Sequence, residues 1–424
     1  MNGSAERRAG RPAFARWLQR TNNITQQFLA IGGQADFVSL AGGLPAAELY
    51  PVEEMRAAAD RALTRWGSRA LEYGPVEGFP ALRGAVAERV SRLAGRRFGA
   101  ENILITTGAM QGLDLLGKVF VDAGDRIVTQ FPTYLGALDA WRPREPSYVR
   151  LEWGLDGAQT ADVLRTAKFA YTVPNYSNPT GVLVPAAERA ALLRKARTAG
   201  TWIIEDDPYL PLQIDGPPGP GILALEAMEN GSGPYRGPVV YLGTLSKSVV
   251  PGLRVGWMVA PADLIQTLAL AKQSTDLSSS MLTHAIALDF MESGFEESHV
   301  PRTVDVYRGR RDTLVRAADE RLARWFEWEI PPGGMFVWMR ARRLPGLREI
   351  DTGALYRFAL EEKVAFVPSS VFDFDGNLRS AMRVNFTRSA PDVIVEGIRR
   401  LGRAVERYLA SNSDEAPFSP DSRP

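Results

Sequence analysis

The chain has 424 residues, of which 45% are apolar and 23% charged, an ordinary globular composition. Lys and Arg number 50 against 49 Asp and Glu, and this balance offers no electrostatic footprint for nucleic acid or an anionic membrane. Cysteine is absent and histidine occurs twice, which argues against disulfides, thiolate nucleophiles and metal centres built on thiolates or several histidines. No apolar run reaches the roughly 18 residues of a membrane span. We therefore expect a cytoplasmic enzyme that acts on a small molecule.

The two ends of the chain lack apolar periodicity and are rich in Ser, Pro, Gly and charge. We predict disordered tails over residues 1–12 and 411–424. Between them, we assign residues 13–50 to an N-terminal segment that joins a small domain. Residues 51–300 form the predicted large domain, and residues 301–410 form the small C-terminal domain.

Between residues 101 and 261, short β-branched runs alternate with segments of helical spacing. The predicted strands are Ile103–Thr107, Arg126–Gln130, Phe169–Val173, Trp202–Glu205, Val239–Leu242 and Trp257–Val259. The predicted helices are Leu113–Val121, Ala186–Ala199 and Leu264–Lys272. This alternation predicts an α/β fold with a mostly parallel sheet covered by helices on both faces. After residue 301, a charged helix over Val304–Arg324 and a strand at Phe336–Met339 predict a smaller α+β domain that also includes the N-terminal segment.

Polar residues follow several predicted strands, where ligands of open α/β sheets bind. Three acids, Glu205–Asp207, end one strand; they favour a ligand, a metal or a base, although one of them could cap a helix. Asn178 lies in an Asn-Pro-Thr-Gly segment that could equally be a plain turn. Tyr134 follows another strand, where a structural tyrosine is the simpler interpretation. Gly108 opens a strand-to-helix turn whose free amides favour phosphate, but a glycine there is more often only a turn.

The segment around Lys247 carries the strongest signal. Of the 50 basic residues only six are lysines, so lysine is rare where positive charge alone would suffice. Lys247 lies among the small and hydroxyl residues of Thr244–Ser248, seven residues before Arg254. An amine desolvated in a pocket has a lowered pKa and becomes a Schiff-base nucleophile.

In their order and spacing, these segments resemble pyridoxal-phosphate enzymes of the aspartate-aminotransferase fold (fold type I, class I/II). They resemble most the branch that holds 2-aminoadipate and kynurenine aminotransferases. Two further segments support this, Phe37–Pro45 and Tyr73–Gly78 followed by Leu82 and Arg83. The resemblance covers most of the chain, from about Phe37 to Leu401.

The resemblance implies pyridoxal 5'-phosphate as cofactor and gives roles to the residues that contact it. Lys247 would form the Schiff base and then move the proton between the substrate Cα and the cofactor C4′. Asp206 would pair with the pyridinium nitrogen, Asn178 and Tyr209 would hydrogen-bond the ring's 3-oxygen, and Tyr134 would stack on the ring. The residues that would hold the phosphate are Gly108, Ala109, Met110, Thr244, Ser246 and Arg254.

The same resemblance implies the substrate contacts and the assembly. Arg383 would clamp the substrate α-carboxylate with its two-pronged guanidinium, next to Gly43 and Asn178. Tyr73 would reach the phosphate of a neighbouring subunit, which predicts a homodimer with shared active sites. The implied reaction moves an amino group from an L-amino acid to a 2-oxo acid.

The chain departs from the family pattern at three places. Gly108–Gln111 stands where Gly-Ser-Gln-Gln is common in this branch, so one hydroxyl worth about 1 kcal/mol is lost. Ile24-Thr25 stands where Ile-Arg is usual, and in family members that arginine can bind an acidic substrate side chain. The expectation of an acidic substrate is therefore weaker, unless Arg16 or Arg20 takes over this role. Pro368–Phe372 is a smaller change in the usual Pro-Gly-x-x-Phe pattern.

Two other classes of function stay open. An enzyme of the same fold could catalyse β- or γ-replacement, elimination or oxidation, for example on a sulfonium amino acid. A regulatory domain like those fused to winged-helix repressors is disfavoured, because only about 36 residues precede Phe37. We expect His284 and His299 to have structural roles.

Overall fold

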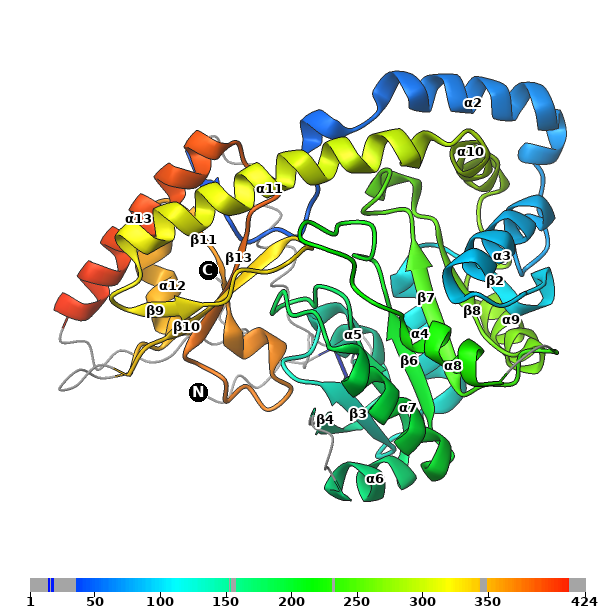
Figure 1. Ribbon diagram of the computed structural model, residues 1–424, viewed down its shortest axis with the longest axis horizontal. Helices are drawn as coiled ribbons and strands as arrows, with labels where there is room; N and C mark the ends of the chain where they lie inside the picture. Colours follow the sequence, from blue (N-terminus) through cyan, green and yellow to red (C-terminus); the bar gives the residue numbers. More distant parts are fainter. Residues whose placement is uncertain are drawn as a thin grey trace, which may run out of the picture.

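The computed structural model describes residues 14–15, 17–18, 36–151, 153, 158–230, 233–343 and 349–411. The predicted tails, apart from Ser411, and the positions Arg16, Arg20, Ile24 and Thr25 lie outside these residues. Figure 1 shows a large lobe and a small lobe, and helix α11 (Phe295–Arg321) runs across both. Among the described residues, no helix combines the length and apolar character needed to cross a membrane.

The large lobe is built on one seven-stranded sheet. Its strands in spatial order are β2 (Ile103–Thr106), β8 (Gly256–Val259), β7 (Val239–Thr244), β6 (Trp202–Asp206), β5 (Ala167–Thr172), β3 (Arg126–Gln130) and β4 (Ser147–Leu151). Strand β8 runs antiparallel to both neighbours and all other pairs are parallel. The prediction of a mostly parallel sheet is therefore confirmed. The sequence analysis missed β4, because an edge strand with exposed Ser147 and Arg150 lacks the continuous apolar run of the inner strands.

Alternate strand residues point to opposite faces of this sheet and feed two hydrophobic cores. Ile204 packs into one core and its neighbour Ile203 into the other. Helices α4 (Ala109–Phe120), α5 (Leu135–Trp141) and α9 (Ala262–Asp276) contribute to the first core. Helices α3 (Pro80–Ala94), α6 (Ala158–Arg165), α7 (Ala186–Ala199), α8 (Ile222–Asn230) and α10 (Met281–Glu292) contribute to the second. The predicted covering of both faces is thus confirmed.

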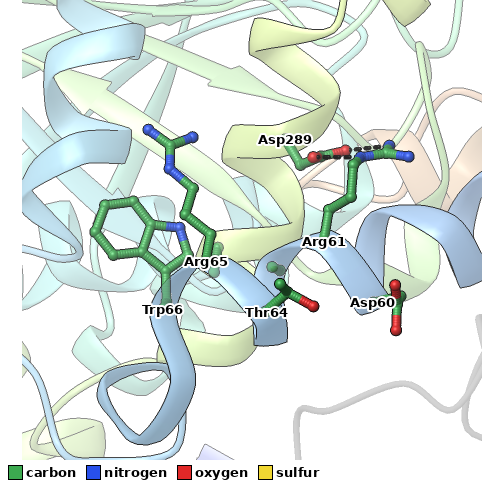
Figure 2. Close-up of a pocket in the computed structure, with 8 residues that line it drawn as sticks. Asp60, Arg61, Thr64, Arg65, Trp66 and Asp289 are labelled. Atoms are coloured by element: carbon green, nitrogen blue, oxygen red, sulfur yellow. Dashed lines mark hydrogen bonds and ion pairs between the residues drawn. The ribbon is translucent and has the colours of Figure 1, made fainter.

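Helix α2 (Val52–Trp66) lies outside this layer and packs along α10. The guanidinium of Arg61 donates two hydrogen bonds to the carboxylate of Asp289, at 2.8 and 2.6 Å (Figure 2). The side chain of Arg65 extends over the ring of Trp66, 4.8 Å from its centre. Arg65 also donates to the carboxylate of Glu292 at 2.5 Å, and this bond and the Arg61–Asp289 pair hold α2 against α10.

The small lobe contains an antiparallel sheet in the order β12 (Val367–Pro368), β13 (Ala381–Asn385), β10 (Phe336–Ala341) and β9 (Phe326–Trp328). A short parallel pair joins β1 (Val38–Ser39) to β11 (Val364–Ala365). Helices α12 (Thr352–Glu361) and α13 (Pro391–Ala410) pack beside them, with α13 against α11. The predicted smaller α+β unit, made of the N-terminal segment and the C-terminal third, is confirmed. The exact domain boundaries stay predictions, and the one between residues 300 and 301 falls inside α11.

Helix α11 begins at Phe295, so the predicted start near Val304 is wrong. The sequence analysis took Pro301 as the break, because proline removes a backbone donor inside a helix. Glu296 and Glu297 lie in the first turn, where the helix dipole favours negative charge. These contributions and the packing against α10 outweigh the one lost hydrogen bond.

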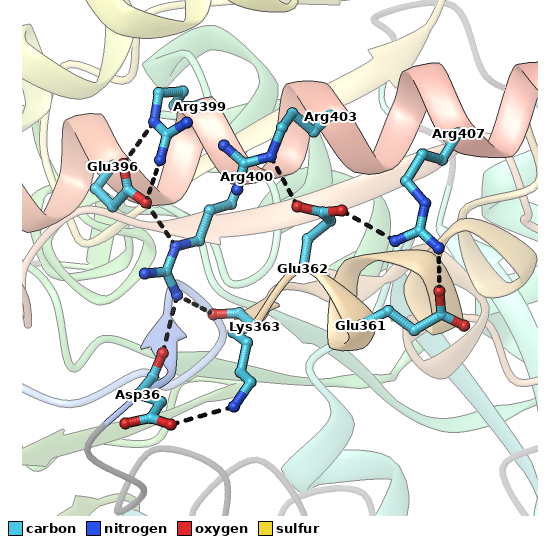
Figure 3. Close-up of polar contacts among 9 residues, drawn as sticks. All are labelled: Asp36, Glu361, Glu362, Lys363, Glu396, Arg399, Arg400, Arg403 and Arg407. Atoms are coloured by element: carbon cyan, nitrogen blue, oxygen red, sulfur yellow. Dashed lines mark hydrogen bonds and ion pairs between the residues drawn. The ribbon is translucent and has the colours of Figure 1, made fainter.

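Ion pairs join α12 and α13 to the start of β1 (Figure 3). Glu362 accepts hydrogen bonds from Arg403 at 2.7 Å and from Arg407 at 2.9 Å. Arg400 donates to the carbonyls of Asp36 and Lys363, at 2.8 and 3.1 Å. Exposed ion pairs of this kind contribute under about 1 kcal/mol each. Their geometric effect is to fix the N-terminal segment just before β1.

Candidate active site

Lys247 lies just beyond the end of β7, at the junction of the two lobes. Its Nζ donates a hydrogen bond to the carbonyl of Gly43, at 2.9 Å. Burial lowers the pKa of this amine to about 8, helped by the positive charges of Arg383 and Arg254. A substantial fraction of the amine is therefore neutral near pH 8 and able to act as a nucleophile or base.

Asp206 is the last residue of β6 and is 2% exposed. Its Oδ2 accepts a hydrogen bond from the hydroxyl of Tyr171 at 2.8 Å. Its Oδ1 is buried without a hydrogen-bond partner in the described part of the chain. Burial raises the pKa of Asp206 to about 7, against the lowering effect of the Tyr171 hydrogen bond. Such a carboxyl group needs a hydrogen-bond donor or a cation at its open oxygen.

The two acids beside Asp206 point to the other face of β6, as the strand pleat requires. Glu205 accepts hydrogen bonds from the amides of Ile222 and Leu223, at 2.7 and 2.8 Å, and so caps the start of α8. Asp207 accepts from Asn175 Nδ2 at 3.0 Å. The helix cap considered in the sequence analysis is therefore Glu205, and only Asp206 of the three faces the cleft.

Arg383 projects from β13 and is 8% exposed. One of its nitrogens donates to Asn178 Oδ1 and another to the carbonyl of Ala41, both at 2.7 Å. Its Nε is buried with no partner among the described residues. The rings of Phe336 and Phe372 flank the guanidinium, with centres 4.2 and 5.1 Å from Cζ. Burial lowers the pKa of Arg383 to about 10, so the group stays cationic at neutral pH.

Asn178 joins Arg383 to the other side of the cleft. Its Nδ2 lies 3.4 Å from the hydroxyl of Tyr209, to which it donates. Both side chains are 5% exposed. The structure thus brings together the two residues that were expected to share one oxygen of the ring.

The turn from β2 to α4 is closely packed against Arg254. Gly108 has φ of +74°, and a Cβ there would lie 2.5 Å from Arg254 Nη2. The same guanidinium nitrogen donates to the carbonyl of Thr107 at 3.4 Å. Helix α4 starts at Ala109, so its first amides have no intrahelical acceptor and face an anion readily.

Two hydroxyl groups lie on the neighbouring strand ends. Thr244 pairs with Gly256, and Gly256 pairs with Thr106, so the ends of β7, β8 and β2 are adjacent. The hydroxyls of Thr244 and Ser246 are 2.9 Å apart. Amides, a guanidinium and two hydroxyls at one sheet edge make a site of suitable chemistry for phosphate.

Tyr134 lies between this turn and Asp206. Its hydroxyl is 3.7 Å from the sulfur of Met110. Burial raises the phenol pKa to about 12, and the negative charge of Asp206 contributes to the same rise. Tyr73, by contrast, is 79% exposed and shows no contact with the other expected residues of its own chain.

Sequence reasoning missed three residues of this site. Tyr171 was read only as part of an apolar strand, although a buried tyrosine usually needs a hydroxyl partner. Phe336 and Phe372 were quoted inside motifs without a role. Phe336 comes beside Arg383 through the β10–β13 pairing, and Phe372, which follows β12, does so through the β12–β13 pairing. Local sequence reveals neither pairing. No group of three or more acids or histidines in the described ranges could hold a metal ion.

The family model "Aminotransferase class I and II" matches residues 35–398. The chain belongs to this family. A 2-aminoadipate transaminase of Thermus thermophilus is 38% identical over 94% of this chain and 98% of its own length. An aromatic-amino-acid aminotransferase of Thermococcus litoralis is 36% identical over 91% of both chains.

Solved structures agree with this membership. The kynurenine aminotransferase of Pyrococcus horikoshii matches with a TM-score of 0.85 and 33% identity, over 94% of this chain and 98% of its own. The α-aminoadipate aminotransferase of Thermus thermophilus, bound to a phosphopyridoxyl-leucine adduct, matches with a TM-score of 0.82 and 37% identity, over the same shares. This aminotransferase therefore has the type I fold, uses pyridoxal phosphate and moves an amino group between an amino acid and a 2-oxo acid.

The residues present fit that cofactor. An open carboxyl oxygen on Asp206 suits a protonated ring nitrogen, and the turn at Gly108 suits a phosphate. The amine of Lys247 lies in the same cleft, where burial keeps it partly neutral.

Proposed function

We propose that this aminotransferase binds pyridoxal phosphate covalently through Lys247 and transfers the amino group of an L-amino acid held by Arg383. The observation that carries the proposal is the convergence of three groups at one site, of which the carboxyl group and the guanidinium are buried and the amine is partly buried. These are an amine with a pKa of about 8, a carboxyl group with an open oxygen and a guanidinium with an open nitrogen. When bound, the cofactor supplies a conjugated ring that accepts the electrons released with the substrate's Cα proton.

Asp206 acts on the ring end of the site in this proposal. Its open Oδ1 would accept a hydrogen bond from the protonated ring nitrogen, while the Tyr171 hydroxyl donates to Oδ2 and so orients the carboxylate. A positive partner lowers the pKa of a carboxyl group, so binding returns Asp206 to its ionised form. The resulting charge pair in a dry site stabilises negative charge developing on the ring.

Lys247 carries the proton once the substrate amine has replaced the lysine amine on the cofactor. The neutral amine would accept the proton from the substrate Cα and deliver it to the cofactor C4′. The nearby cations Arg383 and Arg254 help to keep the amine neutral. The carbonyl of Gly43 holds Nζ at 2.9 Å and can orient it between transfers.

Arg383 and Asn178 bind the substrate α-carboxylate. The carboxylate would take the open face of the guanidinium, while the Ala41 carbonyl and Asn178 hold its other side. Phe336 and Phe372 exclude water from this pair, which strengthens it. Donors named in the relatives, namely aromatic amino acids, kynurenine and 2-aminoadipate, are the first substrates to test.

The remaining expected residues serve the cofactor. Tyr134 stacks on the ring, and Asn178 and Tyr209 share its 3-oxygen. The phosphate is held at the Gly108 turn by the amides of Ala109 and Met110, the hydroxyls of Thr244 and Ser246, and Arg254. The amide of Gly108 itself donates to the Thr106 carbonyl at 2.8 Å, so this residue serves by its missing side chain. The remaining donors compensate for the hydroxyl that is missing at Ala109, where serine is usual.

We also propose a homodimer in which Tyr73 completes the partner's phosphate site. Leu71 and Tyr73 expose 70% and 79% of their surface on one loop, an unusual cost for an isolated chain. Gly74 is closely packed on Met281, so the loop position is fixed by α10. A cytoplasmic location stays a prediction from composition, which cell fractionation tests.

Borohydride reduction of the yellow protein and peptide mapping test the covalent attachment. The proposal requires the label on Lys247, and a label on any of the other five lysines contradicts it.

Single-turnover chemistry tests the reaction. With a reactive amino acid and no acceptor, the enzyme should release one equivalent of 2-oxo acid per site and stop until a second oxo acid is added. Continuous consumption of an amino acid with a Cβ or Cγ leaving group would instead indicate the replacement or elimination alternative.

Subunit mixing tests the assembly. Tyr73→Phe and Lys247→Ala proteins should regain activity when mixed, because one site of the heterodimer then carries neither change. A fully active monomer in sedimentation would contradict the proposal.

A further inference from the structure

Lys272 is an unusual lysine, because its side chain is fully buried in α9 and lies outside the proposed catalytic groups. Its Nζ donates to Asp276 Oδ1 at 2.9 Å, and Asp276 ends the same helix. Burial alone would raise the pKa of Asp276, but hydrogen bonds from Gln111 and Lys272 and the lysine charge outweigh it and lower the pKa. Asp276 is therefore ionised at neutral pH.

A continuous path of hydrogen bonds leads from this pair to the turn at Gly108. Asp276 Oδ2 accepts from Gln111 Nε2 at 2.8 Å, so the carboxylate fixes which way the Gln111 amide points. Gln111 Oε1 then accepts from the backbone amide of Thr107, also at 2.8 Å. The Thr107 carbonyl in turn accepts from Arg254 Nη2, at 3.4 Å.

A second branch reaches the same residue. Ser279 donates to Asp276 Oδ2 at 3.1 Å, and its hydroxyl is 3.3 Å from that of Thr107. Backbone and side chain of Thr107 are thus both tied to Asp276. Since Thr107 directly precedes Gly108, its peptide orientation sets where the first amides of α4 point.

We propose that Lys272 and Asp276 are positioning residues for the cofactor phosphate, acting through Gln111 on the Thr107–Gly108 turn and on Arg254. The inference rests on the proposed function, in which that turn holds the phosphate. A donor set held in place before binding loses less conformational freedom on binding. This matters more in a turn that carries Ala109, which has no hydroxyl to add to the cradle.

The test compares pyridoxal phosphate with pyridoxal, which lacks the phosphate, as ligands of the cofactor-free protein. Gln111→Leu removes the link without leaving a charge unpaired, and Lys272→Met removes the charge that holds Asp276. Each should raise the dissociation constant of pyridoxal phosphate about five- to tenfold, the effect of one lost hydrogen bond or slightly more. The dissociation constant of pyridoxal should change less than about twofold, because the ring end of the site is untouched.

Lys118→Met is the matched control. Lys118 also joins α4 to α9, by donating to Thr275 at 2.8 Å, but it takes no part in the path to Thr107. It should leave both dissociation constants unchanged. If Lys272→Met fails to fold, the double variant Lys272→Met/Asp276→Leu removes both charges and avoids an unpaired one.

Two results would overturn the inference. One is an unchanged affinity for pyridoxal phosphate in Gln111→Leu and in the folded Lys272 variant. The other is an equal loss for both ligands, which would indicate general damage and not an effect at the phosphate. Borohydride labelling of the unmodified protein separates the two proposals, since a label away from Lys247 overturns the proposed function whatever Gln111→Leu does.

Discussion

The loop from Pro174 to Val184 separates two buried arginines that are used in different ways. On the side of the loop that faces α7, here called behind the loop, Arg189 donates through Nε to the Val184 carbonyl at 2.8 Å. Its Nη2 donates to the Pro174 carbonyl at 3.1 Å and to Asn175 Oδ1 at 2.7 Å. On the side that faces β13, here called in front of the loop, Arg383 also contacts the loop, through Asn178. Its buried Nε, however, has no partner within the described ranges.

The acids on the two sides differ in the same manner. Asp207, behind the loop, accepts hydrogen bonds at both oxygens, from Asn175 and from Tyr241. Asp206, in front, has one open oxygen. Buried polar groups normally find partners inside the fold. Of these four groups, the saturated Arg189 and Asp207 therefore belong to the scaffold, and the open Asp206 and Arg383 belong to the site proposed for cofactor and substrate.

The largest expected effect is at Lys247, in front of the loop. Lys247→Ala should lower kcat by about a thousandfold or more, because both the covalent link and the proton carrier are lost. The thermal midpoint of the cofactor-free protein should stay the same or rise, since a buried amine is removed. Lys168→Ala, at a side chain 44% exposed, is the control and should keep full activity.

The next effect separates the two neighbouring acids. Asp206→Asn should lower kcat about a hundredfold with little change in thermal midpoint, because its carboxylate acts on developing charge. Asp207→Asn should instead lower the unfolding free energy by about 1–3 kcal/mol, since it disturbs a saturated network, and keep kcat within about threefold. Denaturant titration and steady-state kinetics measure both. If Asp207→Asn damages kcat more, the assignment of faces on β6 is wrong.

A smaller effect is expected behind the loop at Arg189. Arg189→Met removes the hydrogen bonds to three carbonyls and to Asn175, which should cost about 2 kcal/mol, or about 30-fold in the unfolding equilibrium. Urea unfolding of the cofactor-free protein measures this change. Arg194→Met, on the exposed side of the same helix, should have no such effect. Equal stability of both variants would remove the distinction between the two arginines.

The smallest effect concerns pH. Burial lowers the pKa of Lys247 from its usual value to about 8, and only the neutral amine attacks the cofactor aldehyde. The rate of cofactor uptake should therefore rise about tenfold per pH unit below 8 and level off above it. Stopped-flow absorbance between pH 6 and about 10 measures it. A midpoint near the usual lysine value would show that the amine is hydrated and not buried.

Much of the fold was predictable because its signals are local. The inner strands of the large sheet carry continuous β-branched runs, and α7 was predicted with the bounds it has, Ala186–Ala199. Strand β4 and the first turns of α11 were not predictable. An edge strand lacks the apolar run, and the penalty at Pro301 is outweighed only by contacts with residues distant in sequence.

The amino-acid sequence by itself determined the chemistry available to this protein: a rare lysine among hydroxyl residues, acids at a strand end and an arginine in a later strand. It also determined the family, because the order and spacing of those segments can be recognised in the sequence alone. The residues alone left open which acid of Glu205–Asp207 serves the site, and only the family resemblance pointed to Asp206. The tertiary structure placed Asp206 on the opposite face of β6 from Glu205 and Asp207, and it alone decided that Lys272 is a buried partner of the turn at Gly108. The physical reason is that strand pleating and contacts between residues 36 to 165 positions apart set these arrangements, and local sequence carries no record of them.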